Sequence, residues 1–254
     1  MEAILKVDGL TRFFGGLAAV RDLSFELGPD EVLSLIGPNG AGKTTVFNLI
    51  TGALVPTRGK VLFSRREITG RRPHETARLG VARTFQTTSL FQDEAVLDNL
   101  IIGYRLRTRM GLGDALFQTG RSRREEARSR QRAEEILEFI GLANRAGELA
   151  RNIPQEAQKR LAVGLAMATE PRILLLDEPM GGLTEEETFG MMALIRKVRA
   201  RGISILLIEH KMKVVMSISD RIVVLNYGQK IAEGTPGEVG KNPAVIEAYL
   251  GAQY

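Results

Sequence analysis

The segment "GPNGAGKTT" at residues 37–45 decides the fold of this chain. It follows an apolar run, "VLSLIG" at 32–37, that predicts a buried strand, and it opens a helical pattern from Gly42 to Ile50 with Gly52 at its end. A Gly-x4-Gly-Lys-Thr loop between a strand and a helix is typical of nucleotide-binding proteins. Its glycines let backbone N–H groups close around a phosphate, and the helix adds its positive end. A glycine-rich turn without a ligand is the alternative, and the flanking strand and helix disfavour it.

The residues of this loop have separate predicted roles. Lys43 is expected to reach the β- and γ-phosphates of a nucleotide, and the hydroxyl of Thr44 is expected to ligate Mg²⁺. The residues predicted to contact the nucleotide in this loop are Gly37, Pro38, Asn39, Gly40, Ala41, Gly42, Lys43, Thr44 and Thr45.

Two acidic residues complete the predicted site. Asp177 and Glu178 follow the apolar run at 173–176, so they stand at the carboxyl end of a predicted strand. There Asp177 is expected to hold Mg²⁺ through water, and Glu178 to orient and deprotonate the attacking water. An Asp-Glu pair taken alone is more often an exposed strand exit, but the phosphate-binding loop favours the functional interpretation. No Asn-Lys-x-Asp motif is present, which disfavours a GTPase.

Apolar strands alternate with helices along most of the chain, which predicts an α/β fold with a mostly parallel sheet covered on both faces. Further strands are predicted at 81–86 and 203–210, and a hairpin at 221–234 that turns near Tyr227 and Gly228. Thr184 is expected to open a helix with a T-x-x-E capping box that Gly202 closes.

Residues 90–170 depart from this alternation. They hold helical stretches at 96–102, 125–140 and 157–169 and no convincing strand. We therefore expect a single domain over 1–254, with an α/β core at 1–89 and 171–254. A helical lobe at 90–170 is expected to be inserted into it and to carry a basic insert at 104–132.

The composition narrows the class of protein. The chain has no cysteine, which excludes disulfides and thiolate metal sites. Its first residues, "MEAILKVDGL", lack a basic region ahead of an apolar stretch, so no signal peptide is expected. No apolar run approaches the ~20 residues that cross a bilayer. We expect a soluble chain made in the cytosol.

The positive charge is concentrated in one segment. Residues 105–132 contain nine arginines against Asp114, Glu125 and Glu126, a net charge of +6, whereas the whole chain carries +5. A solvated arginine-rich helix is one interpretation. Contact with anionic lipid headgroups is the other, since each arginine near such a surface contributes roughly 1 kcal/mol.

With these motifs, the chain resembles the ATP-binding subunits of ABC transporters over essentially its full length. Three further residues match that family. Phe14 matches the aromatic residue that stacks on adenine, and Gln86 in "TFQT" matches a glutamine that contacts Mg²⁺ and the attacking water. His210 in "IEHKM" matches a histidine that contacts the γ-phosphate. The resemblance implies ATP and Mg²⁺ as cofactors, and a P-loop core with an antiparallel β subdomain and a helical lobe.

Several segments are similar to the larger ATPase subunit of branched-chain amino acid importers, among them "GVARTFQ", "LLIEHKMKVVMSISDRIVVLN" and the ending "NPAVIEAYLG". The resemblance implies a second ATPase subunit, paralogous or identical, and two transmembrane permease subunits. It also implies a substrate-binding protein outside the membrane, a location on the cytoplasmic face of the membrane, and no nucleic acid.

The family's signature, typically L-S-G-G-Q, is altered here. The aligned residues are Ile153, Pro154, Gln155, Glu156 and Ala157. In this family the signature caps the γ-phosphate that the partner's P-loop holds, so a carboxylate at 156 is expected to repel that phosphate. The residues that would serve the ATP bound by this chain match the family's motifs. This favours a chain that pairs with a different ATPase subunit, whose signature is unaltered. An alteration without functional meaning is the alternative.

Three other functions remain open from the sequence. The chain could serve a lipopolysaccharide-type exporter, although those relatives generally have a shorter segment after Gly103. It could be a soluble ABC ATPase of translation or DNA repair, but such proteins usually carry two cassettes or a long coiled coil. It could also be a regulatory subunit that turns over slowly, against which the intact Glu178 counts.

Overall fold

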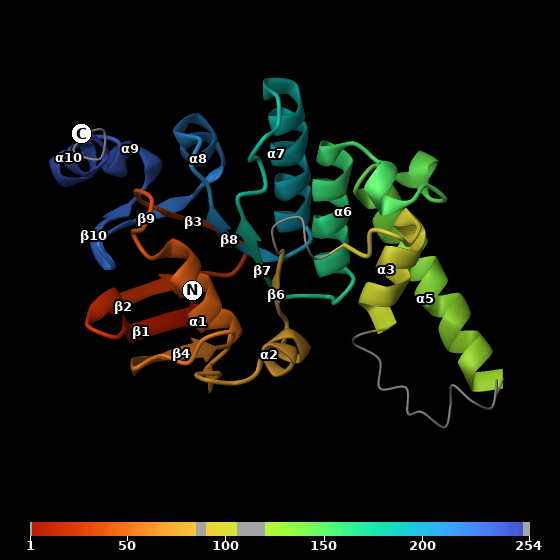
Figure 1. The fold of residues 1–254 in the computed structure, drawn as a ribbon, viewed down its shortest axis with the longest axis horizontal. Coiled ribbons are helices and arrows are strands. Elements are labelled where there is room, and N and C mark those ends of the chain that lie inside the picture. Colours follow the sequence, from red (N-terminus) through yellow and green to blue (C-terminus); the bar gives the residue numbers. More distant parts are fainter. Residues whose placement is uncertain (1, 85–89, 106–119, 251–254) are drawn as a thin grey trace.

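Two β-sheets lie against each other in the computed structural model, which describes residues 2–84, 90–105 and 120–250 (Figure 1). The smaller sheet is antiparallel and has the order β2-β1-β4-β5. The larger sheet has the order β10-β9-β3-β8-β7-β6, and its strands are parallel except for β10. The strands are β1 Leu5–Phe14, β2 Leu17–Leu27, β3 Val32–Ile36, β4 Arg58–Phe63, β5 Arg66–Glu67, β6 Val81–Arg83, β7 Ile173–Asp177, β8 Ser204–Ile208, β9 Arg221–Asn226 and β10 Gln229–Gly234.

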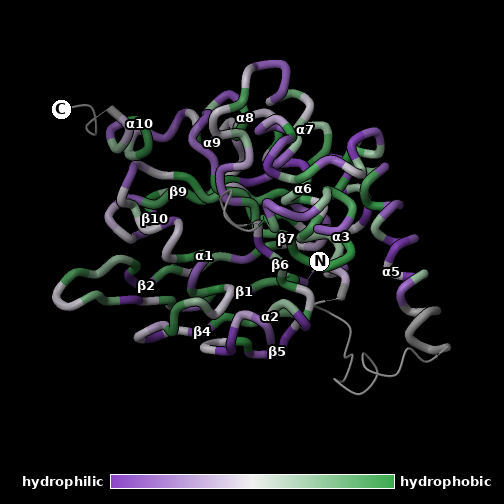
Figure 2. The backbone as a smooth tube through the Cα atoms, turned by 45° about the vertical axis from the view of Figure 1, so that its right-hand side comes forward, coloured by the Kyte–Doolittle hydropathy of each residue, from purple (hydrophilic) through white to green (hydrophobic). Residues whose placement is uncertain are grey.

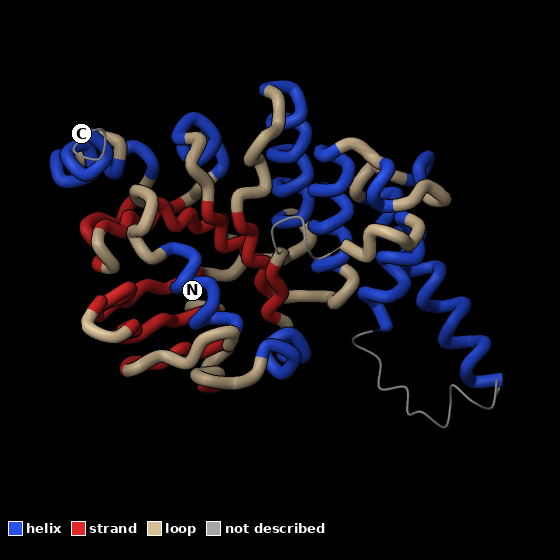
Figure 3. The backbone as a smooth tube through the Cα atoms, viewed as in Figure 1, coloured by secondary structure: helices blue, strands red, loops and turns tan. Residues whose placement is uncertain are grey.

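Helices cover both faces of the larger sheet and form the right-hand part of the molecule in Figures 1 and 3. The α-helices are α1 Lys43–Thr51, α2 Pro73–Leu79, α3 Val96–Arg105, α5 Gly120–Phe139, α6 Gln155–Met167, α7 Glu185–Arg199, α8 Met212–Ile218, α9 Pro236–Val239 and α10 Pro243–Leu250. Two short 3₁₀ turns, Ala143–Arg145 and Ala150–Asn152, connect α5 to α6.

The central strands are buried on both faces because their side chains alternate between two cores. In β7, Ile173 and Leu175 belong to the core between the sheets, which also contains Phe47 of α1. Leu174 and Leu176 belong to the core beneath the helices α3, α5, α6 and α7. In Figure 2 the central strands of the larger sheet are largely hydrophobic, whereas α5 carries many hydrophilic residues. The continuous apolar runs of the sequence are thus explained by burial on two sides.

The strands and helices that the sequence predicts are present, with small differences at their ends. The strand from Val81 ends at Arg83, and α7 ends at Arg199 rather than at Gly202. Thr184 and Glu187 form the predicted capping box. The described part of 90–170 contains helices and turns, and a single β-bridge joins Ala95 to Leu149. About half of the basic insert at 104–132, namely residues 106–119, lies outside the described residues.

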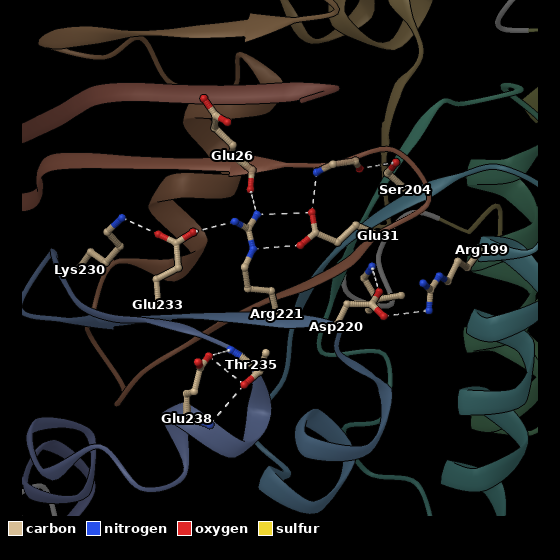
Figure 4. Close-up of polar contacts among 12 residues, drawn as sticks. Glu26, Glu31, Arg199, Ser204, Asp220, Arg221, Lys230, Glu233, Thr235 and Glu238 are labelled. Atoms are coloured by element: carbon tan, nitrogen blue, oxygen red, sulfur yellow. Dashed lines mark hydrogen bonds and ion pairs between the residues drawn. The ribbon is translucent and has the colours of Figure 1, made fainter. Parts of the chain in front are cut away.

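An ion-pair network fixes the sheets to each other at the amino-terminal edge of the parallel strands (Figure 4). The guanidinium of Arg221 lies 3.0 Å from Glu31 and 3.1 Å from Glu233, and it also donates to the Glu26 carbonyl of β2. These contacts stabilise the amino-terminal edge of the parallel strands. Loops lie at the opposite, carboxyl-terminal edge. Among the described residues, no helix is both long enough and apolar enough to cross a membrane.

Candidate nucleotide-binding site

Three loops meet at the carboxyl edge of the larger sheet, because β3, β8 and β7 are adjacent and parallel. They are the loop at 37–45 after β3, the turn at 178–183 after β7, and the segment at 209–211 after β8. A cavity of about 330 Å³ lies between them. Its lining residues are Leu17, Ala18, Ala19, Asn39, Gly40, Gly42, Lys43, Thr44, Thr45, Glu178, His210 and Tyr227.

The phosphate-binding loop adopts a backbone that only glycine permits at two positions. Gly37 has φ 150° and Gly42 has φ 99°. A Cβ atom at these positions would lie 2.1 Å from the Leu225 carbonyl oxygen and 2.3 Å from the Ala19 carbonyl oxygen, respectively. Gly40, with φ 80°, faces open space instead, with no atom within 4 Å of such a Cβ. The loop is therefore packed against the protein at both ends and open at its centre, where a phosphate would enter.

Lys43 is buried beneath this loop with its ammonium group turned toward it. Its Nζ donates hydrogen bonds to the carbonyl oxygens of Gly37 at 2.7 Å and Pro38 at 2.9 Å. Burial lowers the pKa of Lys43, and the carboxylates of Glu178 and Asp177 oppose that shift. The positive charge is thus held at the loop, where phosphate oxygens can take the place of the carbonyls.

Glu178 and His210 meet across the cavity. His210 Nε2 lies 2.7 Å from Glu178 Oε1, which is a hydrogen-bond distance. Glu178 has φ +49°, a conformation that costs a non-glycine residue about 1 kcal/mol, and its N–H donates to the Ile208 carbonyl of β8. Backbone strain of this kind is concentrated at functional sites, and here it occurs at the residue whose carboxylate contacts His210.

Asp177 is buried at the end of β7, and its two carboxylate oxygens differ in their hydrogen bonds to the described residues. Its Oδ2 accepts a hydrogen bond from Arg83 at 2.7 Å, whereas Oδ1 is buried and has no hydrogen-bond partner within residues 2–84, 90–105 and 120–250. Asp177 borders a second cavity of about 240 Å³, which Glu178 also lines. Carboxylate and hydroxyl oxygens, such as those of Asp177 and of Thr44 in the first cavity, are ligands of the kind that Mg²⁺ takes. Such an ion takes one or two protein ligands, and among the described residues no group of three or more acidic, histidine or cysteine side chains is arranged to hold a metal ion by itself.

The loop at 37–45, Glu178 and His210 therefore come together as the sequence predicts. Phe14, at the end of β1, is 45% exposed and is not among the cavity-lining residues. The Arg12 guanidinium lies 4.8 Å from the centre of its ring. Gln86 falls outside the described residues.

The altered signature lies at the start of α6, with Pro154 immediately before the helix. Gln155 lines the second cavity beside Glu178. Glu156 forms an ion pair with Arg160 one turn later, and their side chains are 19% and 21% exposed. The sequence predicts that a carboxylate at 156 would repel the partner's γ-phosphate, and the ion pair with Arg160 would weaken that repulsion.

Three charged residues behind the site were not predicted. Lys159 of α6 donates to the Glu178 carbonyl at 3.1 Å, Arg83 holds Asp177, and the buried Glu209 contacts both loops. A charged residue inside an apolar run, as in "VARTF", was the available signal for Arg83. Tyr227, which is 88% exposed, was predicted only as a turn residue, yet it lines the cavity.

Residues 20–181 match the family model described as "ABC transporter". Residues 229–254 match a second model, described as "Branched-chain amino acid ATP-binding cassette transporter". The chain is 45% identical over 251 residues to the high-affinity branched-chain amino acid transport ATP-binding protein LivG of Escherichia coli, covering 98% of each chain. It is also 45% identical over 249 residues to the corresponding protein BraF of Pseudomonas aeruginosa, again covering 98% of each.

Solved structures agree with this assignment. The ADP conformation of MJ1267, an ATP-binding cassette of an ABC transporter, superposes with a TM-score of 0.87 at 32% identity, covering 99% of this chain and all of the other. A nucleotide-free cassette from an ABC transporter superposes with a TM-score of 0.86 at 31% identity, covering 98% and 99%. These findings confirm the predicted fold class and the predicted family.

Proposed function

This chain belongs to the ABC transporter family of ATP-binding proteins, and on that premise we propose that it hydrolyses ATP to power the import of branched-chain amino acids. The observation that carries the proposal is the cavity at 37–45, where Lys43, Thr44, Glu178 and His210 face one space. The relatives' names supply the substrate class, since LivG and BraF are transport ATP-binding proteins for these amino acids. The same names favour import of amino acids over the lipopolysaccharide and soluble alternatives.

The geometry supports separate roles for these residues in phosphate binding, proton transfer and Mg²⁺ binding. Lys43 and the open backbone around Gly40 would bind the β- and γ-phosphates, and Glu178 would accept a proton from the attacking water. Glu178 is engaged with His210 at 2.7 Å here, so a γ-phosphate that takes over His210 would release the carboxylate for water. Mg²⁺, held by Thr44 and Asp177 and, on the family resemblance, by Gln86, would neutralise phosphate charge.

The same premise suggests the assembly. We propose that two ATPase subunits close around ATP and that their closure drives two permease subunits. In this assembly the chain would be peripheral, at the cytoplasmic face of the membrane. The intact residues 37–45, Glu178 and His210, together with the altered residues 153–157, favour a paralogous partner over a second copy.

Purification of the tagged chain from gently solubilised membranes tests this assembly. We expect a second ATPase subunit with an intact signature and two permease subunits to co-purify in fixed ratio, identified by mass spectrometry. A Gly42→Ala variant, whose Cβ would clash with the Ala19 carbonyl, is the control for dependence on the nucleotide site. Recovery of the chain from the soluble fraction alone, without permease subunits, would contradict the proposed role in transport.

A further inference from the structure

A buried carboxylate lies directly behind the site and has no role in the scheme above. Glu209 lies between the end of β8 and His210, and it is only 2% exposed. A carboxylate in such surroundings is stable only when hydrogen bonds or charges replace the water that it loses. The groups that form hydrogen bonds to Glu209 therefore show which segments it holds in place.

Each oxygen of Glu209 serves a different loop. Oε1 accepts a hydrogen bond of 2.7 Å from the N–H of Met180, two residues after Glu178. Oε2 accepts from the N–H of His210 at 3.0 Å and from the N–H of Lys211 at 3.4 Å. One side chain therefore bridges the turn that follows β7 and the segment that follows β8.

The surrounding contacts support this bridge. Lys159 lies near enough for the carboxylates of Glu209 and Glu178 to raise its pKa against the lowering by burial, and it donates to the Glu178 carbonyl. Lys211 Nζ donates to the Leu183 carbonyl at 2.9 Å and to the Thr188 hydroxyl at 3.1 Å. The segment at 209–211 is thus tied to both ends of the turn at 178–183.

This bridge links the two loops that carry Glu178 and His210. Glu178 and His210 belong to different loops, and their 2.7 Å contact persists only while the two loops keep their relative position. We propose that Glu209 is a positioning residue for hydrolysis, which holds the turn after Glu178 and the backbone of His210 in register. The proposal rests on the proposed function, and it adds a residue that does not line the nucleotide cavity.

The Glu209→Gln variant tests it, because glutamine has nearly the same shape but only one accepting oxygen. One of the two loops then loses its acceptor, and the amide N–H₂ faces a backbone N–H. We expect kcat for ATP hydrolysis in the purified complex to fall at least about tenfold, the size of one lost hydrogen bond to a charged group. The KM and the Kd for ATP should stay within about twofold, since Lys43 and the loop at 37–45 are unchanged.

Glu31→Gln is the matched control. Glu31 also accepts a backbone N–H, from Gly28, and pairs with Arg221, but it lies at the opposite edge of the sheet (Figure 4). We expect this variant to lower the thermal midpoint and to leave kcat within about twofold. Glu209→Asp, which keeps the charge but shortens the reach, serves as a second variant if Glu209→Gln does not fold. It should also lower kcat without changing the KM.

The outcomes separate the inference from the function beneath it. A Glu209→Gln protein that melts like wild type and keeps its kcat overturns the inference, as does a loss confined to the Kd for ATP. A wild-type complex that hydrolyses no ATP would instead overturn the proposed function.

Discussion

Replacing Glu178 with glutamine is expected to abolish turnover while leaving ATP binding intact. Removal of a general base lowers a rate by roughly 10²- to 10⁴-fold, and the amide cannot accept the proton of the attacking water. The contacts that hold the phosphates come from Lys43 and the backbone at 37–45, which the change does not touch. The affinity for ATP should therefore stay within about twofold, and the ATP-bound dimer should accumulate.

Steady-state hydrolysis and equilibrium ATP binding, measured on the same purified complex, check this expectation. Glu186→Gln is the matched control, because Glu186 is an exposed carboxylate in the first turn of α7 and does not line the nucleotide cavity. It should hydrolyse ATP at the wild-type rate. A Glu178→Gln complex that retains most of its turnover would exclude Glu178 as the base.

Restoring the signature is expected to convert a poor homodimer into an active one. With Pro154→Ser, Glu156→Gly and Ala157→Gln combined, the backbone at 156 could approach the γ-phosphate held by the other copy, and the like charge would be gone. We expect homodimer turnover to rise at least about tenfold, while ATP affinity of the monomer stays nearly unchanged. The wild-type chain should remain slow on its own, because both of its composite sites would carry Glu156.

The ion pair between Glu156 and Arg160 makes a finer test possible. Because Arg160 offsets the charge, Glu156→Gln alone should recover only a small part of the gain, and the glycine should supply most of it. Hydrolysis rate against protein concentration, for the wild type and both variants, is the measurement. Robust and concentration-dependent hydrolysis by the unaltered chain would disprove the asymmetric-site idea.

Features that depend on local spacing could be predicted from the sequence. The loop at 37–45 and the capping box at Thr184 each lie within a few residues, so the pattern alone specifies them. Glu178 and His210 could be proposed because each follows an apolar strand, and parallel strands bring their carboxyl ends to one edge. The antiparallel sheet was predicted only from the family resemblance. The register shifts between β1 and β2 obscure the alternation of apolar and polar residues that would otherwise indicate these strands.

The charged groups behind the site could not be predicted, because they depend on contacts between distant segments. Arg83 and Asp177 are 94 residues apart, and Met180 and Glu209 are 29 apart. No local pattern in the sequence predicts that Glu209 is buried. Only its neighbour His210 has a role predicted from the sequence. The ion pair between Glu156 and Arg160 could have been predicted, because the two residues are four positions apart on one helix.

Uptake of labelled leucine into proteoliposomes that contain the assembled complex tests the central claim most directly, namely that hydrolysis in the cavity at 37–45 powers import of branched-chain amino acids. ATP is supplied on the side of the ATPase subunits, and the labelled amino acid with its binding protein on the other side. We predict ATP-dependent uptake by the wild type, competition by isoleucine and valine but not by lysine, and background uptake by the Glu178→Gln complex. A wild-type complex that hydrolyses ATP but accumulates none of the three amino acids would contradict the account.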